Sequence, residues 1–316
     1  MLAEIKIRRA HPVGATLSQT IMRDGWQLRT LDWPAEGNSR GSILFQGGRG
    51  DFIEKYLETL AYWHAQGWSV TAFDWRGQGK SGRLSDDVNV GHIDDFAVWI
   101  DDLAEFYKRW KATTAGPHIV IGHSMGGHLI LRALVEARIA PDAVVFIAPM
   151  FGIETPPVPL GVARFLFSGL SKIGLAKRPA WKGNERPAAP WASRQRFLTH
   201  DAERYADEIW WTEKDPLLKL GPPSFGWLAA AINSTRGTEA PGVLERVAVA
   251  LLILGTDGDR LVSPAAIRRF AARLPDAEFH MYDASAAHEI LRECDAVRDD
   301  VLGRIDGFLG KVAPPL

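Results

Sequence analysis

The segment Gly122-His123-Ser124-Met125-Gly126-Gly127 limits what this chain can fold into more than any other. It follows a short apolar run, 118–121, and precedes a helical pattern that continues to Leu134. A serine flanked at two residues' distance by glycines is typical of a tight strand-to-helix turn from which the serine projects. The motif therefore predicts a strand, a sharp turn at Ser124 and a helix. An ordinary glycine-rich connection with a surface serine would give the same pattern.

Strand and helix patterns alternate on both sides of this turn. Alternation at these lengths predicts a parallel sheet with helices on both faces. The predicted strands are 42–46, 69–73, 118–122, 143–147, 249–254 and 278–282. One predicted helix begins at Ile53, and four others cover 94–111, 125–138, 264–273 and 295–309.

The N-terminal region has a different pattern. Residues 15–22 and 26–33 are extended runs joined at Asp24-Gly25, which is a strong hairpin signal. Together with the strand at 42–46, they predict an antiparallel meander before the parallel part of the sheet.

The alternation stops after Met150 and resumes near residue 249. The segment between, 151–241, is rich in proline and contains helical patterns at about 160–175, 201–211 and 224–235. A chain of 316 residues suits one large domain with an insertion. We therefore expect an α/β core domain of residues 1–150 and 242–316, interrupted by a helical insertion at 151–241.

Composition excludes several classes of function. A formal charge of -1 gives no overall attraction to nucleic acid, and a single cysteine, Cys294, excludes an internal disulfide and a thiolate metal cluster. Residues 1–22 are charged and lack the apolar region of a signal peptide, and the longest apolar run, 247–254, is too short to span a bilayer. The expected location is the cytoplasm, with no nucleic-acid partner.

Residues 74–82 imitate two phosphate-binding motifs. Gly79-Lys80-Ser81 resembles the end of a P-loop, but the motif's first glycine would fall on Asp74, whose charge repels phosphate. The spacing of Gly77, Gly79 and Gly82 resembles a dinucleotide fingerprint, yet no helical pattern begins there. We interpret both matches as chance and expect no nucleotide cofactor.

A nucleophilic serine needs a base to take its proton and an acid to orient that base. In an open parallel sheet such groups gather at the carboxyl ends of strands. Asp257 and Asp259 both follow the strand at 249–254, and the residues alone do not decide between them. His288 follows the strand at 278–282, in a loop before a helix. The order serine, acid, histidine is that of an α/β-hydrolase.

The tetrahedral intermediate of such a reaction needs backbone donors for its oxyanion. One candidate is the amide of Met125, at the positive end of its helix. The other lies in the glycine-rich loop 47–50, which follows the strand at 42–46.

Over residues 15–309 the chain resembles the lysophospholipase and monoacylglycerol lipase family of α/β-hydrolases. The segments that carry the resemblance are Gly47-Gly48-Arg49, Lys55-Tyr56, Asp74-x-Arg76-Gly77-Gln78-Gly79-x-Ser81-Gly82, Gly122-His123-Ser124-Met125-Gly126-Gly127, Asp215-Pro216-Leu217, Gly221-Pro222, Trp227, Asp259-Arg260-Leu261-Val262 and Ala287-His288-Glu289-Ile290. The resemblance implies that Ser124 is the nucleophile, Asp259 the acid and His288 the base. It also implies oxyanion donors at the amides of Arg49 and Met125. Many relatives have His-Gly where this chain has Gly47-Gly48.

The family's activity implies hydrolysis of a glycerolipid ester, either a lysophospholipid or a monoacylglycerol, through an acyl-enzyme, with no cofactor or metal. Two alternatives stay open. A small-molecule carboxylesterase or thioesterase would use the same three residues, whereas a catalytically silent binding module would be expected to lack at least one of them.

The family places a cap over the active site where this chain has residues 151–241. Apolar residues including Phe165 and Leu166 fill its first part, and between Arg164 and Arg196 there are eight Lys or Arg residues against one acid. Such a segment suits a lid that touches an anionic membrane surface, here the inner membrane, or a phosphate head group. Residues that only pack the cap onto the core would leave the same pattern. The substrate contacts that we expect are Gly48, Phe165, Leu166 and Trp227.

Overall fold

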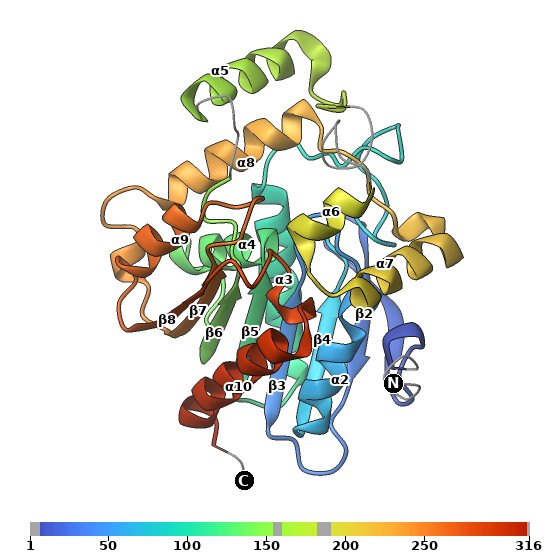
Figure 1. Ribbon diagram of the computed structural model, residues 1–316, viewed down its shortest axis with the longest axis vertical. Helices are drawn as coiled ribbons and strands as arrows, with labels where there is room; N and C mark the ends of the chain where they lie inside the picture. The colour runs from blue at the N-terminus through green and yellow to red at the C-terminus, as the bar shows by residue number, and fades with distance from the viewer. Residues whose placement is uncertain (1–6, 154–159, 182–190, 315–316) are drawn as a thin grey trace.

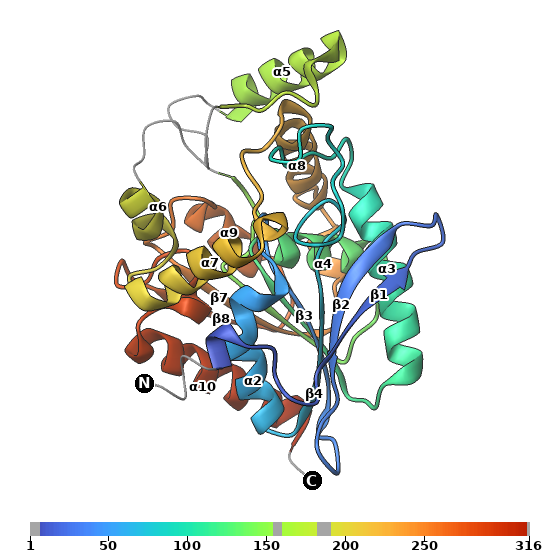
Figure 2. The same ribbon diagram turned by 90° about the vertical axis from the view of Figure 1, so that its right-hand side faces the viewer.

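A mixed eight-stranded sheet forms the centre of the computed structural model, which describes residues 7–153, 160–181 and 191–314 (Figures 1 and 2). Its strands are β1 Thr16–Ile21, β2 Gln27–Trp33, β3 Gly41–Gln46, β4 Trp68–Phe73, β5 His118–His123, β6 Ala143–Ile147, β7 Ala250–Thr256 and β8 Ala277–Tyr282. They lie in the order β1-β2-β4-β3-β5-β6-β7-β8. β2 pairs antiparallel with β1 and β4, and the remaining neighbours are parallel.

The expected N-terminal meander needs one correction. β1 and β2 form the predicted hairpin, but β3 does not continue it: β3 pairs in parallel with β4 and β5, and β2 pairs with β4 instead. All six residues of β3 are buried, whereas β1 is exposed along nearly its whole length. A strand that is buried on both faces belongs in the middle of a parallel sheet, and a solvated one belongs at an edge.

Helices cover both faces of the sheet, as predicted (Figure 1). The helices α2 Leu57–Ala65 and α10 Asp295–Val312 pack on one face with Trp63 and Trp68 in their core. The other face carries α3 Ala97–Thr113, α4 Met125–Val135 and α9 Pro264–Ala271. Short helical turns complete the chain: η1 Ile53–Tyr56, η2 Ser171–Leu175, η3 Pro216–Leu218, η4 Leu244–Arg246 and η5 Ile290–Arg292.

Four helices lie between β6 and β7: α5 Leu160–Leu170, α6 Trp191–Leu198, α7 Ala202–Lys214 and α8 Phe225–Thr238. α5 packs against α8 and is the outermost of the four, on the side of α8 that faces away from the sheet (Figures 1 and 2). The patterns at 160–175, 201–211 and 224–235 correspond to α5 with η2, α7 and α8, whereas α6 was not predicted. Within the described ranges, no helix has the length and apolar character needed to cross a membrane.

The loop after β4, residues 74–82, folds around its own acid. The Asp74 carboxylate accepts hydrogen bonds from the amides of Ile53 and Lys80, both at 2.9 Å. No helix follows the loop directly, since the next one, α3, begins at Ala97. Amides that bind Asp74 are not directed at a phosphate, which agrees with a structural role for this segment.

Candidate active site

Ser124 lies at the sharp turn between β5 and α4, as the motif predicts. Its backbone has φ 53° and ψ -120°, a conformation that non-glycine residues rarely adopt and that stores strain. Two backbone hydrogen bonds fix it: the Ser124 amide donates to the Ile147 carbonyl at 3.0 Å, and the Ser124 carbonyl accepts from the Met150 amide at 2.9 Å. The strained serine is therefore held by the end of the neighbouring strand, β6.

Close packing explains the glycines of this motif. A Cβ added to Gly122 would lie 2.7 Å from the Gly127 nitrogen, and one added to Gly126 would lie 2.5 Å from the carbonyl oxygens of Gln46 and Gly47. Because these neighbours are backbone atoms, they cannot move aside without shifting the strand or the helix. The glycines thus allow β5, α4 and the loop after β3 to meet at Ser124.

The structure brings Ser124, His288 and Asp259 into one chain of hydrogen bonds. His288 Nε2 lies 2.9 Å from Ser124 Oγ, and His288 Nδ1 lies 2.6 Å from Asp259 Oδ2. The other Asp259 oxygen accepts from the amides of Leu261 at 2.8 Å and Val262 at 3.0 Å. All three side chains are buried. This is the arrangement that a serine needs to lose its proton to a histidine.

The partners of His288 define its tautomer. An ionised carboxylate only accepts hydrogen bonds, so Nδ1 carries the proton toward Asp259 and Nε2 accepts from the Ser124 hydroxyl. Burial favours the neutral imidazole, but the Asp259 carboxylate, with Glu289 and Asp51, outweighs burial and raises the pKa of His288 above its usual value. The surrounding carboxylates therefore stabilise the imidazolium form of His288.

The two candidate acids are clearly separated by the structure. Asp257 is half-exposed and pairs with Arg268 at 2.5 Å, whereas Asp259 is buried against His288. Asp259 is thus the carboxylate that can orient the histidine, which agrees with the assignment implied by the family resemblance.

The loop 47–50 lies against Ser124. A Cβ at Gly48 would be 2.8 Å from Ser124 Cβ, so the glycine lets the backbone approach the serine. The Gly48 amide donates to Asp51 Oδ2 at 2.6 Å. The next amide, that of Arg49, is the oxyanion donor that the family resemblance implies on this loop. Met125 opens α4, and amides in the first turn of a helix have no acceptor within the helix.

Of the expected substrate contacts, Gly48 and Trp227 lie at this loop. Trp227, on α8, is buried with the Arg49 guanidinium 5.4 Å from its ring centre. Phe165 and Leu166, on α5, expose 80% and 48% of their surface.

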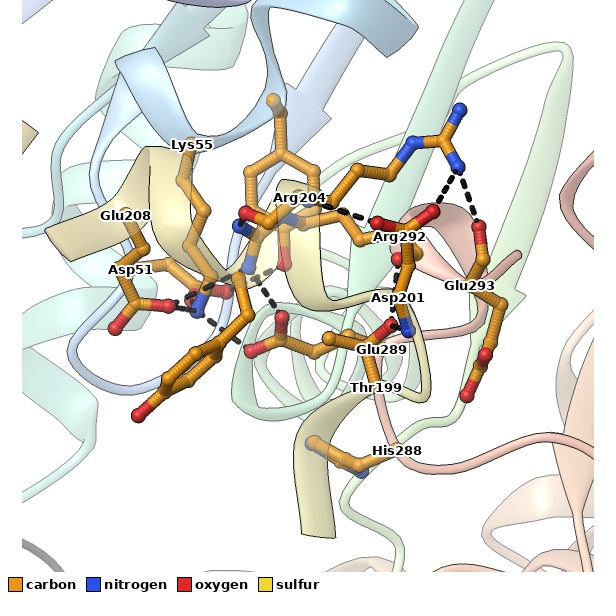
Figure 3. Close-up of polar contacts among 12 residues, drawn as sticks. Asp51, Lys55, Thr199, Asp201, Arg204, Glu208, His288, Glu289, Arg292 and Glu293 are labelled. Atoms are coloured by element: carbon orange, nitrogen blue, oxygen red, sulfur yellow. Dashed lines mark hydrogen bonds and ion pairs between the residues drawn. The ribbon is translucent and has the colours of Figure 1, made fainter. Parts of the chain in front are cut away.

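Several residues behind the site were not assigned a role from the sequence. His123 Nδ1 lies 2.9 Å from Tyr56 Oη and 3.2 Å from Asp51 Oδ2, and its ring centre is 4.8 Å from that of His288. The Lys55 ammonium is buried beside Asp51 and Glu289 (Figure 3). All of these residues except Asp51 occur within the family-like segments, but only the fold brings them together.

Part of the insertion contacts the loop that carries His288. The His288 amide donates to the Phe197 carbonyl at 3.3 Å, and the Glu289 amide donates to the Leu198 carbonyl at 2.7 Å. Both acceptors belong to α6, the helix that was not predicted. The histidine is thus supported by the sheet on one side and by the insertion on the other.

In the described part of the chain, no group of three or more His, Cys, Asp or Glu side chains is arranged so that it could hold a metal ion.

Comparisons with known proteins identify the family of this chain. The family described as serine aminopeptidase, S33 (Hydrolase_4), matches residues 37–295. Lysophospholipase L2 of Escherichia coli (strain K12) is 31% identical over 305 residues, covering 92% of this chain and 86% of that protein. Monoacylglycerol lipase of Mycolicibacterium smegmatis is 25% identical over 292 residues, covering 88% and 92%.

Among solved structures, a soluble variant of monoglyceride lipase from Saccharomyces cerevisiae, in complex with a substrate analog, matches with a TM-score of 0.77. The two chains are 19% identical, and the match covers 96% of this chain and 97% of that one. This likeness supports the fold. The expected family and fold are confirmed: the chain belongs to the S33 (Hydrolase_4) family of α/β-hydrolases and is a serine hydrolase related to lysophospholipases and monoacylglycerol lipases.

Proposed function

We propose that this protein hydrolyses carboxylic esters of glycerolipids, with a lysophospholipid or a monoacylglycerol as substrate. The observation that carries the proposal is the buried hydrogen-bond chain from Ser124 through His288 to Asp259, at 2.9 and 2.6 Å. The names of the two relatives, a lysophospholipase and a monoacylglycerol lipase, support the choice of substrate class.

In the first half of the reaction, Ser124 Oγ attacks the acyl carbonyl while His288 Nε2 takes its proton. Asp259 keeps Nδ1 protonated and stabilises the imidazolium. The amides of Arg49 and Met125 donate to the oxyanion, and loss of one such donor in a related site lowers kcat by about 10²- to 10³-fold. His288 then protonates the leaving alcohol, which departs as the glycerol part of the lipid.

In the second half, a water molecule takes the place of the alcohol. His288 removes its proton as the water oxygen attacks the acyl carbon, and a second tetrahedral intermediate uses the same two amides. Collapse of this intermediate returns the proton to Ser124 Oγ and releases the fatty acid. Water is the only co-reactant.

A fluorophosphonate probe tests whether Ser124 is the nucleophile. We expect the wild-type protein to be labelled and the Ser124→Ala variant to be unlabelled. The matched control is Ser285→Ala, which removes an exposed serine from the loop after β8 and should keep full labelling. Folded wild-type protein that does not label would overturn the hydrolase proposal and favour a binding module.

A matched substrate panel tests the substrate class. It comprises lysophospholipids, monoacylglycerols, short p-nitrophenyl esters and acyl thioesters. We expect the highest kcat/KM for one of the two glycerolipid classes. A clear preference for short esters or thioesters would replace the glycerolipid proposal with the carboxylesterase or thioesterase alternative.

We also propose that residues 1–150 and 242–316 form the catalytic domain and that residues 151–241 form a cap that touches an anionic membrane surface. The support comes from α5 and the turn after it, where Val162, Phe165, Leu166 and Ile173 are 48% to 80% exposed. Exposed basic residues accompany them: Arg164, Lys172, Lys177 and Arg178. An exposed apolar stripe with neighbouring cations is what an interfacial helix presents to anionic lipid.

Two parts of the predicted basic run do not enter this argument. Lys182, Glu185 and Arg186 lie outside the described residues. Arg194 pairs with Glu208 at 2.8 Å inside the protein.

Sedimentation with vesicles tests the membrane contact. We expect binding to vesicles that contain phosphatidylglycerol, weaker binding to pure phosphatidylcholine, and loss of binding in Ile173→Asp. Val13→Asp is the matched control, because Val13 is 97% exposed but lies before β1, outside the insertion. Equal binding of both variants would contradict a docking role for the α5 region.

A further inference from the structure

Three buried carboxylates meet on one lysine. Lys55 Nζ lies 2.7 Å from Asp51 Oδ1, 2.6 Å from Glu289 Oε1 and 3.0 Å from Glu208 Oε2 (Figure 3). The Lys55 side chain is 3% exposed. Burial lowers the pKa of Lys55, but the three carboxylates outweigh it and raise the pKa, so the ammonium stays charged.

Each carboxylate comes from a different segment around Ser124. Asp51 directly follows the loop 47–50, here called the oxyanion loop, and its Oδ2 accepts a hydrogen bond from the Gly48 amide at 2.6 Å. Glu289 directly follows His288 in the chain. Glu208 lies on α7 of the insertion. The lysine therefore connects three segments at one point: the oxyanion loop, the insertion, and the loop that carries His288 and Glu289, here called the histidine loop.

The same network is completed by two arginines. Arg292 pairs with Glu289 and, at 3.4 Å, with Glu208, which also pairs with Arg194 at 2.8 Å. Three carboxylates thus face three cations. Among the described lysines and arginines, Lys55 is the one that forms an ion pair with Asp51. Removal of Lys55 would leave the buried Asp51 carboxylate without its lysine partner, with Tyr56 and His123 as its remaining side-chain contacts.

Stability alone does not account for such a cluster. Buried ion pairs generally stabilise a fold no more than apolar side chains of similar volume, because desolvation offsets their attraction. What a cluster of directional contacts does supply is a fixed geometry for the groups that it joins. Here those groups are the Gly48 amide, which precedes the Arg49 amide, and Glu289, which follows His288.

We propose that Lys55 is a positioning residue, which fixes the oxyanion loop through Asp51 and the histidine loop through Glu289. The inference deepens the proposed function and rests on it. The Gly48 backbone is close enough to Ser124 that a Cβ would clash with it, so a rotation of this loop moves the Arg49 amide relative to the attacked carbonyl. A misplacement of about 1 Å can cost on the order of 10²-fold in rate.

Steady-state kinetics of Lys55→Met on a short p-nitrophenyl ester test the proposal. We expect kcat to fall roughly 10- to 100-fold, the range typical of groups that orient an active site. KM should change by less than about threefold, since only the transition state uses the oxyanion donors. Lys55→Arg should recover most of kcat, because the guanidinium keeps the charge.

Arg76→Met is the matched control. Arg76 forms buried hydrogen bonds with Asp102 at 2.6 and 2.7 Å, between the loop after β4 and α3. Its removal also leaves the buried Asp102 carboxylate unpaired, and the contacts of the Arg76 side chain, Asp24, Trp26 and Asp102, lie outside the loops that carry Gly48 and His288. We expect lower stability with kcat within twofold of wild type. A loss of kcat equal to that of Lys55→Met, or full kcat in Lys55→Met, would overturn the proposal.

A double-mutant cycle with Asp51→Asn tests the route of the effect. If Lys55 acts through Asp51, the double variant should lose no more kcat than the worse of the two single variants. Independent, multiplying losses would refute that route. The double variant also removes both charges together, so it supplies the measurement if Lys55→Met does not fold.

Fluorophosphonate labelling separates the two proposals. Unlabelled wild-type protein contradicts the hydrolase function. Labelled wild-type protein together with an unchanged kcat in Lys55→Met contradicts only the positioning role.

Discussion

The carbonyl of Leu198 accepts a hydrogen bond from the amide of Glu289 at 2.7 Å, one residue beyond His288. The preceding carbonyl, that of Phe197, accepts from His288 itself, and the hydroxyl of Thr199 donates to the Arg292 carbonyl at 2.7 Å. Phe197 and Leu198, at the end of α6, and Thr199, directly after it, therefore bind the segment that carries His288. The insertion is part of the framework of the site.

Thr199→Val tests this attachment. The valine keeps the shape of the side chain but removes the donor to the buried Arg292 carbonyl, so we expect a loss of about 1–3 kcal/mol in the free energy of unfolding. Urea denaturation measures it. Thr212→Val is the control, because the Thr212 hydroxyl only bonds to carbonyls one turn back within α7. Equal stability of the two variants would contradict a structural role for the Thr199 contact.

Asparagine substitutions at the two neighbouring acids should differ widely. Asp259→Asn leaves His288 without its carboxylate and disturbs its tautomer, which lowers kcat by up to about 10⁴-fold in related triads. Asp257→Asn removes a half-exposed pair with Arg268 and should change kcat by less than about twofold. Hydrolysis of one ester by both variants checks this. The reverse order of activities would reassign the acid.

Activity should fall on the acid side with a midpoint above about pH 6.5, the usual pKa of histidine. His288 must be neutral to accept the serine proton, and its pKa is raised by Asp259, Glu289 and Asp51 against the effect of burial. A profile of kcat/KM between pH 5 and 9 measures this midpoint. A midpoint below the usual value would show that burial dominates instead.

The same group has the opposite effect on stability. The imidazolium bound to Asp259 stabilises the folded state fully below the unfolded pKa, and this contribution is lost as pH rises through the higher folded pKa. We expect His288→Gln to remove that slope from the pH dependence of the free energy of unfolding. An unchanged slope in the variant would assign it to other groups.

Two glycine substitutions should have contrasting effects, one lowering kcat and the other raising stability. Gly48→Ala places a Cβ 2.8 Å from Ser124 Cβ, so we expect a loss of kcat through a displaced loop or serine. Gly303→Ala lies in the exposed part of α10 with nothing within 4 Å of the new Cβ, and should stabilise the protein by roughly 0.5–1 kcal/mol through helix propensity. Kinetics and thermal unfolding of both variants measure this contrast. Full activity of Gly48→Ala would show that the loop can yield at no cost.

The sequence predicts the sheet and the nucleophile turn well, because both leave local signals. The buried strands are short apolar runs, and the glycines beside Ser124 are required by backbone contacts within the motif. The position of His288 also follows from local pattern, as a histidine in a loop between a strand and a helix. The choice between Asp257 and Asp259 does not, since both follow β7 and only their distant partners, Arg268 and His288, distinguish them.

Other features depend on contacts between distant segments. The pairing of β3 with β4 and β5 requires the chain to cross over between distant segments. The sequence gives a partial signal for the central place of β3, because its six residues are all buried and such a strand is an apolar run without alternation. α6 has a weak apolar pattern, and its end is held by the loop after His288. The ion cluster around Lys55 joins residues up to 234 positions apart, so no local pattern could predict it.

The contacts at the end of α6 also restrict how a substrate reaches the serine. Any displacement of this helix pulls on the amides of His288 and Glu289 and disables the base during the movement. A route to Ser124 that keeps the hydrogen bonds of His288 intact must therefore leave α6 in place. The end of α6 thus braces His288, so this part of the insertion belongs mechanically with the core.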